Sequence, residues 1–188
     1  MVRALTLALL ALAAGCASTA DVATPSAHIA EGVVLTLPLP PAYPDTRTIL
    51  QTGYARYGNH DGAFEAVLSL APERTEIVMT MLGGPRLATI VWDSVGVRAE
   101  RSAFAPDNVP VENILVDIFI TVWPPALVEA ALPEGLVLTV NEAGQRTIRR
   151  GDEVLMTVTP DPEDAARVSI RNNALGYEVV IVSQSVEP

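Results

Sequence analysis

The sequence predicts a mainly β protein, in which an antiparallel, curled sheet of roughly ten strands forms an open half-barrel with two helices over its concave face. Short extended runs separated by turn residues predict the strands. One segment in the middle of the chain has the spacing of helices. Runs such as Leu136-Val137-Leu138 are apolar on both faces, which is typical of a sheet that curls around helices or an apolar cavity.

Extended runs make up most of the predicted domain. They are bounded by residues typical of hairpin turns, such as Gly83-Gly84-Pro85 and Gly151-Asp152. Strands that follow one another on short connections pair antiparallel, so the sequence predicts a meander and not a βαβ protein. The predicted strands are residues 46–57, 63–70, 75–82, 87–92, 96–101, 136–141, 146–150, 153–159, 167–172 and 177–183.

Two helices are predicted between the fifth and sixth of these strands. In residues 110–122 the apolar side chains recur at offsets of one, three and four, and Asn108 is the expected N-cap. The sequence Trp123-Pro124-Pro125 ends or bends this helix. Residues 126–132 form the second helix, which stops at Pro133-Glu134-Gly135.

The N-terminus has the features of an exported lipoprotein. Arg3 precedes an apolar run over residues 4–14, which is within the ~7–15 residues of a signal-peptide core and below the ~20 needed to span a bilayer. The run ends in Ala14-Gly15-Cys16, and Cys16 is the only cysteine. This arrangement resembles a lipobox and predicts a signal peptide over residues 1–15 with acylation of Cys16. The alternative is an ordinary secretory signal with an incidental thiol.

Residues 16–32 are predicted to be the acylated cysteine and a tether, and residues 33–188 a single domain. The tether is small and polar, without a helical or strand period. Ala17 and not Asp follows the cysteine, which resembles the pattern for outer-membrane retention. The expected location is the periplasmic face of the outer membrane of a Gram-negative bacterium, lipid-anchored. The proline-rich residues 38–44 are expected to lie along a domain edge or to recruit a partner protein.

The charge balance excludes some partners. The chain has 22 acidic residues against 12 basic ones, all of them arginine, and a formal net charge of −10. Nucleic acid phosphates and anionic lipid headgroups repel such a chain. No nucleic acid partner is expected, and membrane contact is expected to depend on apolar surface or on the anchor.

Signatures of an enzyme are missing from the sequence. Of the two histidines, His28 lies in the predicted tether and His60 in a predicted turn, and there is no Gly-x-Ser-x-Gly, His-Glu-x-x-His or phosphate-binding glycine loop. Asp161, Glu163 and Asp164 lack the regular spacing of a calcium loop and are interpreted as a solvated turn. The protein is therefore expected to be non-catalytic, with no metal and no cofactor.

Asp117 is the unusual residue of the predicted first helix, because it lies among apolar side chains. It either makes a polar contact at the mouth of a cavity or anchors the helix to the sheet. The second interpretation is favoured, with a hydrogen bond or an ion pair to one of Arg146, Arg149 or Arg150, because buried carboxylates are usually paired.

A family resemblance adds to this interpretation. The segments Asn113-Ile114-Leu115-Val116-Asp117, Val122-Trp123-Pro124 and Ala131-Leu132-Pro133, with the hairpin of residues 145–151, resemble an uncharacterised family of bacterial lipoproteins known as a domain of unknown function. The resemblance extends over residues 33–182. Because members are often encoded beside genes for aryl-polyene pigments and fatty-acid-like synthesis, it implies traffic of a lipid-like product to the outer membrane.

The family's architecture is also similar to that of the LolA and LolB lipoprotein carriers, in which helices close an open half-barrel over an apolar cavity. Met81-Leu82-Gly83-Gly84 before residues 87–91 resembles their strand pair around a glycine. This chain lacks the long loop with a protruding apolar tip between those strands, so the resemblance does not imply lipoprotein insertion.

The expected function is that of an outer-membrane lipoprotein that binds or carries an acyl chain, a lipid or an aryl-polyene-type product in its half-barrel. Methionine side chains suit such a ligand, although ordinary core packing explains them equally well. The alternative is a structural lipoprotein that recruits an export or assembly machine of the envelope through protein contacts. The candidate cavity residues are Ile77, Met79, Met81, Leu115, Ile118, Phe119 and Trp123.

Overall fold

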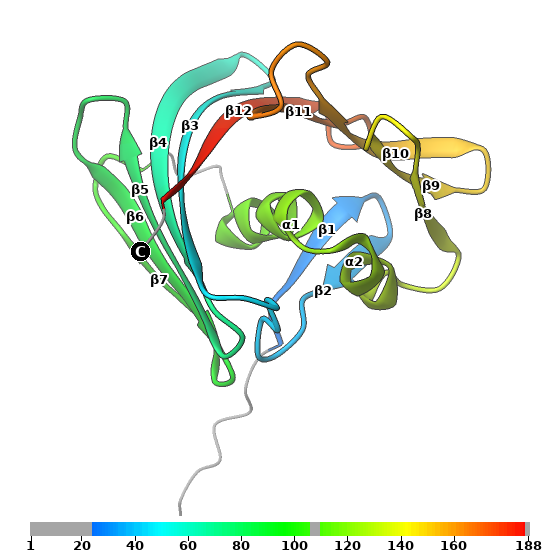
Figure 1. The fold of residues 1–188 in the computed structure, drawn as a ribbon, viewed down its shortest axis with the longest axis horizontal. Helices are drawn as coiled ribbons and strands as arrows, with labels where there is room; N and C mark the ends of the chain where they lie inside the picture. Colours follow the sequence, from blue (N-terminus) through cyan, green and yellow to red (C-terminus); the bar gives the residue numbers. More distant parts are fainter. Residues whose placement is uncertain (1–23, 106–109, 187–188) are drawn as a thin grey trace, which may run out of the picture.

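The structure is a computed structural model that describes residues 24–105 and 110–186. It confirms the predicted fold class, a ten-stranded antiparallel sheet with two helices inserted mid-chain (Figure 1). The strands are β1 Ser26–Ala30, β2 Val33–Thr36, β3 Arg47–Tyr57, β4 His60–Leu70, β5 Arg74–Met81, β6 Arg86–Asp93, β7 Gly96–Arg101, β8 Leu136–Val140, β9 Arg146–Arg150, β10 Glu153–Pro160, β11 Arg167–Asn172 and β12 Tyr177–Val186, and the helices are α1 Val111–Val122 and α2 Pro125–Ala131.

The order of the strands in the large sheet is β7-β6-β5-β4-β3-β12-β11-β10-β9-β8. Each half is the meander that short turns produce, and the two halves are joined by the long pairing of β3 with β12. That pairing runs from Thr48 opposite Val186 to Tyr57 opposite Tyr177. The sheet arches around α1, α2 and the separate β1–β2 hairpin (Figure 1).

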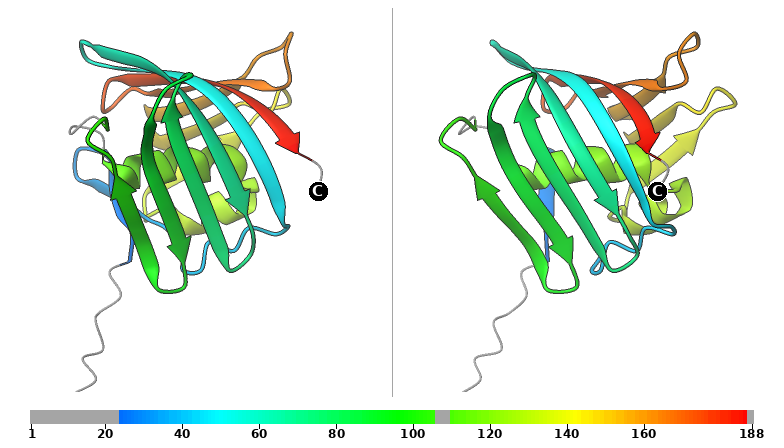
Figure 2. Two further views of the ribbon diagram at one scale, coloured as in Figure 1. Left: turned by 90° about the vertical axis from the view of Figure 1, so that its left-hand side faces the viewer. Right: turned by 60° about the vertical axis from the view of Figure 1, so that its left-hand side comes forward.

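Alternation along the strands separates an inner face, which packs against the helices, from an outer face. On β3, Ile49 and Gln51 are buried while Leu50 between them is exposed, and on β6 the buried residues include Ile90 and Trp92. Because side chains alternate every second residue, each strand contributes one row to the core. The outer face of β3 to β7 is turned toward the viewer in Figure 2, with the helices behind it.

The C-terminal part of the predicted tether is a strand and not a tether. Residues 26–30 form β1, which pairs with β2, and its Ile29 is buried and accepts a hydrogen bond of 3.0 Å from the Asn172 side chain. The alternating small apolar residues of this segment are too few to stand out among its serine, threonine and proline residues. The predicted signal peptide, residues 1–15, and Cys16 lie outside the described residues.

The proline-rich segment lies along the edge of the domain and covers one end of the core. Two tryptophan indoles donate hydrogen bonds to its backbone: Trp92 Nε1 to the Pro38 carbonyl at 2.9 Å and Trp123 Nε1 to the Pro41 carbonyl at 2.7 Å. An extended proline-rich segment makes no internal backbone hydrogen bonds, so its carbonyls are free to accept from side chains. The segment therefore covers the core at Trp92 and Trp123.

Helix α1 crosses the inner face of the sheet, and most of its side chains are buried. It begins after Pro110, which makes no capping side-chain bond, while the predicted cap Asn108 lies outside the described residues. It ends at Trp123, as the following two prolines predict. Neither helix in the described part of the chain is long and apolar enough to cross a membrane.

Candidate functional site

An aromatic cluster fills one end of the space between the sheet and α1. The Trp123 ring stacks on Trp92 with ring centroids 5.3 Å apart, and Tyr43 meets its edge at 5.0 Å. Phe119 lies 5.5 Å from Trp123 and 6.1 Å from Trp92. Trp92, Phe119 and Trp123 are completely buried. This end of the half-barrel is therefore packed like an ordinary protein core.

The predicted cavity residues divide into two groups. Ile77, Leu115, Ile118, Phe119 and Trp123 are buried in the core, where they pack against one another and their neighbours. The two methionines lie farther along β5, where the inner face opens. Met79 is half-buried and Met81 is 44% exposed.

The open end of the inner face, called here the mouth, consists of Tyr57, Phe64, Met79, Met81 and Tyr177. Strand register places these residues on one face in two groups: Met81 lies opposite Phe64, and Tyr57 lies opposite Tyr177, four residues along β3 from the Gly53 partner of Phe64. The Tyr57 and Tyr177 rings are 6.2 Å apart. These are apolar and aromatic side chains on a face that is otherwise buried, and they are only partly covered.

Gly53 leaves room for the tip of the Phe64 ring over β3 at the mouth. A Cβ atom added at Gly53 would lie 2.3 Å from Cζ of Phe64, whereas one added at Gly62 on the neighbouring strand would meet nothing within 4 Å. We expect Gly53→Ala to push the ring aside and to lower the free energy of unfolding by about 1–3 kcal/mol. Urea denaturation followed by circular dichroism measures this, with Gly62→Ala as the control. Equal stability of the two variants would show that the ring does not lie over Gly53.

Asp117 bonds to a tyrosine across the mouth. Tyr177 Oη donates to Asp117 Oδ1 at 2.6 Å, which joins α1 to β12. Helical spacing puts Asp117 about 200° around the helix from Phe119, so the carboxyl faces the mouth while the Phe119 ring faces the aromatic cluster. Burial raises the pKa of Asp117 to about 7, although the bond from Tyr177 acts in the opposite direction. Burial and the nearby carboxyl raise the pKa of Tyr177.

The predicted pairing of Asp117 with an arginine is wrong. Arg146 points to the end of α1 instead, where its Nη1 donates to the carbonyls of Ile120 at 2.6 Å and Trp123 at 2.7 Å. The last carbonyls of a helix have no partner within the helix, so a guanidinium is a suitable donor there. Of the other two candidates, Arg149 bonds to the Asp152 carbonyl. Arg150 bonds to Glu153 and to the Glu31 carbonyl.

The outer face carries a second feature, an open hollow of about 450 Å³ over β12, β3, β4 and β5. Its apolar lining is Leu50, Ala66, Val67, Val78 and Val182. Leu50 and Val67 are among the exposed large apolar side chains of the domain. No described helix covers this face (Figure 2).

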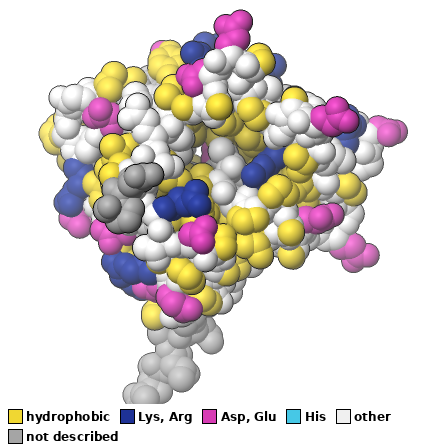
Figure 3. Space-filling view, in the orientation of Figure 1, with side chains coloured by type: hydrophobic (Ala, Val, Ile, Leu, Met, Phe, Trp, Pro, Cys, Tyr) yellow, Lys and Arg dark blue, Asp and Glu magenta, His cyan; other side chains and the backbone are white. Residues whose placement is uncertain are grey.

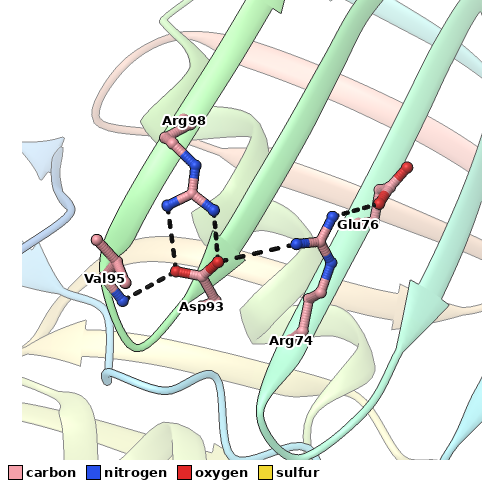
Figure 4. Close-up of polar contacts among 5 residues, drawn as sticks. All are labelled: Arg74, Glu76, Asp93, Val95 and Arg98. Atoms are coloured by element: carbon pink, nitrogen blue, oxygen red, sulfur yellow. Dashed lines mark hydrogen bonds and ion pairs between the residues drawn. The ribbon is translucent and has the colours of Figure 1, made fainter.

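Ion pairs cover the outer face of β5, β6 and β7 beside that hollow. Asp93 is bonded by Arg98 and by the N–H of Val95, and Arg74 bridges Asp93 at 3.9 Å and Glu76 at 2.7 Å (Figure 4). The guanidinium of Arg98, with the Val95 N–H, holds the pKa of Asp93 below its ordinary value. Exposed pairs of this kind add little stability, but they keep the area polar.

The acidic turn of residues 161–166 is held by its own hydrogen bonds. In the predicted solvated turn, Asp161 Oδ1 accepts the Glu163 N–H and Asp164 Oδ1 accepts the Ala166 N–H, each within the turn. Among residues 24–105 and 110–186 no three histidine, cysteine, aspartate or glutamate side chains are placed to hold a metal ion. Acidic and arginine side chains are dispersed on the face in Figure 3.

The comparison with protein families identifies the domain. The family described as "Protein of unknown function (DUF3261)" matches residues 48–185. This chain belongs to the DUF3261 family. The match extends from β3 to β12, so the DUF3261 domain contains the large sheet, both helices and every residue of the mouth. The β1–β2 hairpin lies before it.

One comparison with solved structures gives a distant match. A crystal structure of a DUF1329 family protein from Desulfovibrio piger is similar at 11% sequence identity and a TM-score of 0.27, over 74% of this chain and 84% of that chain. A likeness at this level supports no statement about function. No curated protein sequence matches this DUF3261 chain.

Proposed function

We propose that this DUF3261 protein is a non-catalytic lipoprotein, acylated at Cys16 and held at the periplasmic face of the outer membrane, that binds the apolar chain of a lipid-like ligand at the mouth. The observation that carries the proposal is the half-covered apolar surface of Phe64, Met79 and Met81. It lies on the inner face of the sheet, which α1 and the aromatic cluster otherwise bury.

Burial of apolar surface supplies the driving force. Covering an acyl chain stabilises the complex by about 0.8 kcal/mol for each buried methylene, without any polar catalytic group. The methionine thioethers adapt to chains of different shape. The packed aromatic cluster limits a ligand to the mouth, because the space beyond it is occupied by Phe119 and Trp123.

The described chain begins at the end of the domain opposite the mouth. The Pro25 carbonyl accepts a 2.8 Å bond from the Leu37 N–H, and the next residue, Pro38, accepts the bond from Trp92. In the sheet, Trp92 lies in register with the start of β3, whereas Tyr57 at the mouth is the last residue of β3. The chain therefore enters the domain at the aromatic cluster.

This arrangement supports a mouth that faces the periplasm. Eight residues separate Cys16 from Pro25, and eight residues extend over at most about 29 Å. An anchor of that length holds the aromatic-cluster end toward the membrane and leaves the mouth on the far side. A ligand that crosses the periplasm would meet the mouth first, so we propose that the protein receives its ligand from the periplasm.

The test is native mass spectrometry with lipid extraction on the chain from residue 16 carrying Cys16→Ser, purified from the periplasm. We expect acyl or polyene species to co-purify, and to be lost in Met81→Glu, which puts a charge at the mouth. The control is Val137→Glu, at an exposed apolar residue of β8 away from the mouth. A ligand-free mass, together with no uptake of a fluorescent acyl probe, would overturn the proposal.

The hollow on the outer face favours a second candidate function, in which the lipoprotein recruits an envelope export or assembly machine. An apolar hollow beside a polar network is a common arrangement of protein-binding surfaces. If the hollow recruits such a machine, Leu50→Glu abolishes assembly of that machine in the cell, while the ligand content of the purified protein stays unchanged. The opposite result, loss of ligand with assembly intact, would argue against it.

A further inference from the structure

We propose that the mouth contains a head-group site, formed by Asp117 and Thr121 of α1 and Tyr177 of β12, that selects lipid-like ligands with an uncharged hydroxyl head over those that end in a carboxylate or a phosphate. The inference rests on the proposed function, since it concerns the polar end of the same ligand.

Asp117 has bonding capacity left over. Tyr177 occupies Oδ1, and no described residue donates a hydrogen bond to Oδ2. The residue is only half-buried, so part of it stays accessible at the mouth. This carboxylate oxygen can accept a hydrogen bond from a ligand O–H in place of water, and hydrogen bonds to a charged acceptor are stronger than those between neutral groups.

Thr121 is the second member of the site. It lies one turn beyond Asp117 on the same side of α1, since residues four apart share a helix face. Its Oγ1 is buried and has no hydrogen-bond partner among the described residues. A hydroxyl head that donates to Asp117 Oδ2 still has two lone pairs, so it can accept from Thr121 in turn. A ligand hydroxyl satisfies both groups at once.

The charges around the mouth oppose an anionic head. The arginines nearest to Tyr177 in strand register are Arg56 and Arg171, and by alternation both lie on the outer face. Of the inner-face arginines, Arg146 is bound to the last carbonyls of α1, Arg150 pairs with Glu153, and Arg47 lies at the end of β3 opposite the mouth. Arg101 lies in the row of Met79, six residues along β12 from Tyr177. A phosphate or carboxylate beside Tyr177 would lose its hydration next to the Asp117 carboxyl, whose charge opposes it, which is unfavourable.

The experiment measures displacement of a fluorescent acyl probe by a fatty alcohol, a fatty acid and an alkyl phosphate of equal chain length, above neutral pH. The protein is the chain from residue 16 with Cys16→Ser. We expect the alcohol to bind on the order of tenfold more tightly than either anion, which is about 1.4 kcal/mol. Asp117→Asn should reduce this preference to about twofold or less by strengthening the binding of the anions, and Thr121→Val should weaken alcohol binding severalfold.

A matched control exists on the outer face. Asp61 accepts a hydrogen bond from Tyr54, so the pair has the same chemistry as Asp117 with Tyr177 but lies outside the mouth. Asp61→Asn should leave the preference for the alcohol unchanged. Equal affinity of the three ligands, or the same effect of both asparagine variants, would overturn the head-group site alone. Failure of all three ligands to displace the probe would overturn the proposed function and the head-group site with it.

Discussion

Replacement of Trp123 by alanine is expected to lower the free energy of unfolding by about 3–5 kcal/mol. The indole is completely buried between Trp92, Phe119 and Tyr43, so its removal leaves a cavity that three rigid rings cannot fill. The change also removes the donor to the Pro41 carbonyl, which then lacks a partner in a buried position. The cavity is the larger of the two losses.

Trp123→Phe separates these contributions, because it keeps most of the apolar volume and removes the indole N–H. We expect this variant to lose about 1–2 kcal/mol. Val137→Ala, at an exposed side chain of β8, is expected to change stability by less than about 0.5 kcal/mol. Urea denaturation followed by far-ultraviolet circular dichroism measures all three. A loss below about 1 kcal/mol in Trp123→Ala would show that the aromatic cluster is not a packed core.

The local elements of the fold were predictable from the sequence, while its long-range pairings were not. Hairpin turns and alternation predict the strands, and helical spacing followed by two prolines predicts α1 and its end. The pairing of β3 with β12 joins residues more than a hundred positions apart, and no local signal specifies it. Strand β1 was missed for a different reason: it pairs with the nearby β2, but its few apolar residues do not stand out among the serine, threonine and proline residues of this segment.

The candidate site was predictable only in part. Asp117 stands out in the sequence as a carboxyl on an apolar helix, but its partner depends on which strand faces that side of α1. Tyr177 begins the last strand and carries no local mark of its role. Thr121 can be recognised as a candidate only in the structure, where its hydroxyl has no hydrogen-bond partner among the described residues.

The sequence alone does not distinguish residues that line the mouth from residues that pack in the core. Met81 and Ile77 share one face of β5, four residues apart, and both are apolar. The structure leaves Met81 44% exposed and buries Ile77 completely. The difference arises because α1 and the rings of Phe119 and Trp123 cover one end of the inner face and stop short of the other.

The stability of the protein is expected to depend on pH through Asp117. The pKa of this carboxyl is about 7 in the folded protein and about 4 in the unfolded chain, so between these values the folded state holds a proton that the unfolded state releases. Its stabilising contribution is complete below about pH 4 and is lost as the pH rises through 7. The loss is of the order of 4 kcal/mol across this window, since each pH unit corresponds to about 1.4 kcal/mol.

The difference in unfolding free energy between the wild-type protein and Asp117→Asn isolates this contribution, because asparagine cannot ionise while every other titrating group is shared. We expect the wild-type protein to lose stability relative to the variant between about pH 4 and pH 7, with no further change above. Tyr177→Phe should move the window to higher pH, because the bond from Tyr177 lowers the pKa of Asp117. A difference that stays constant with pH would mean that the carboxyl is solvated and that the mouth is wetter than the structure shows.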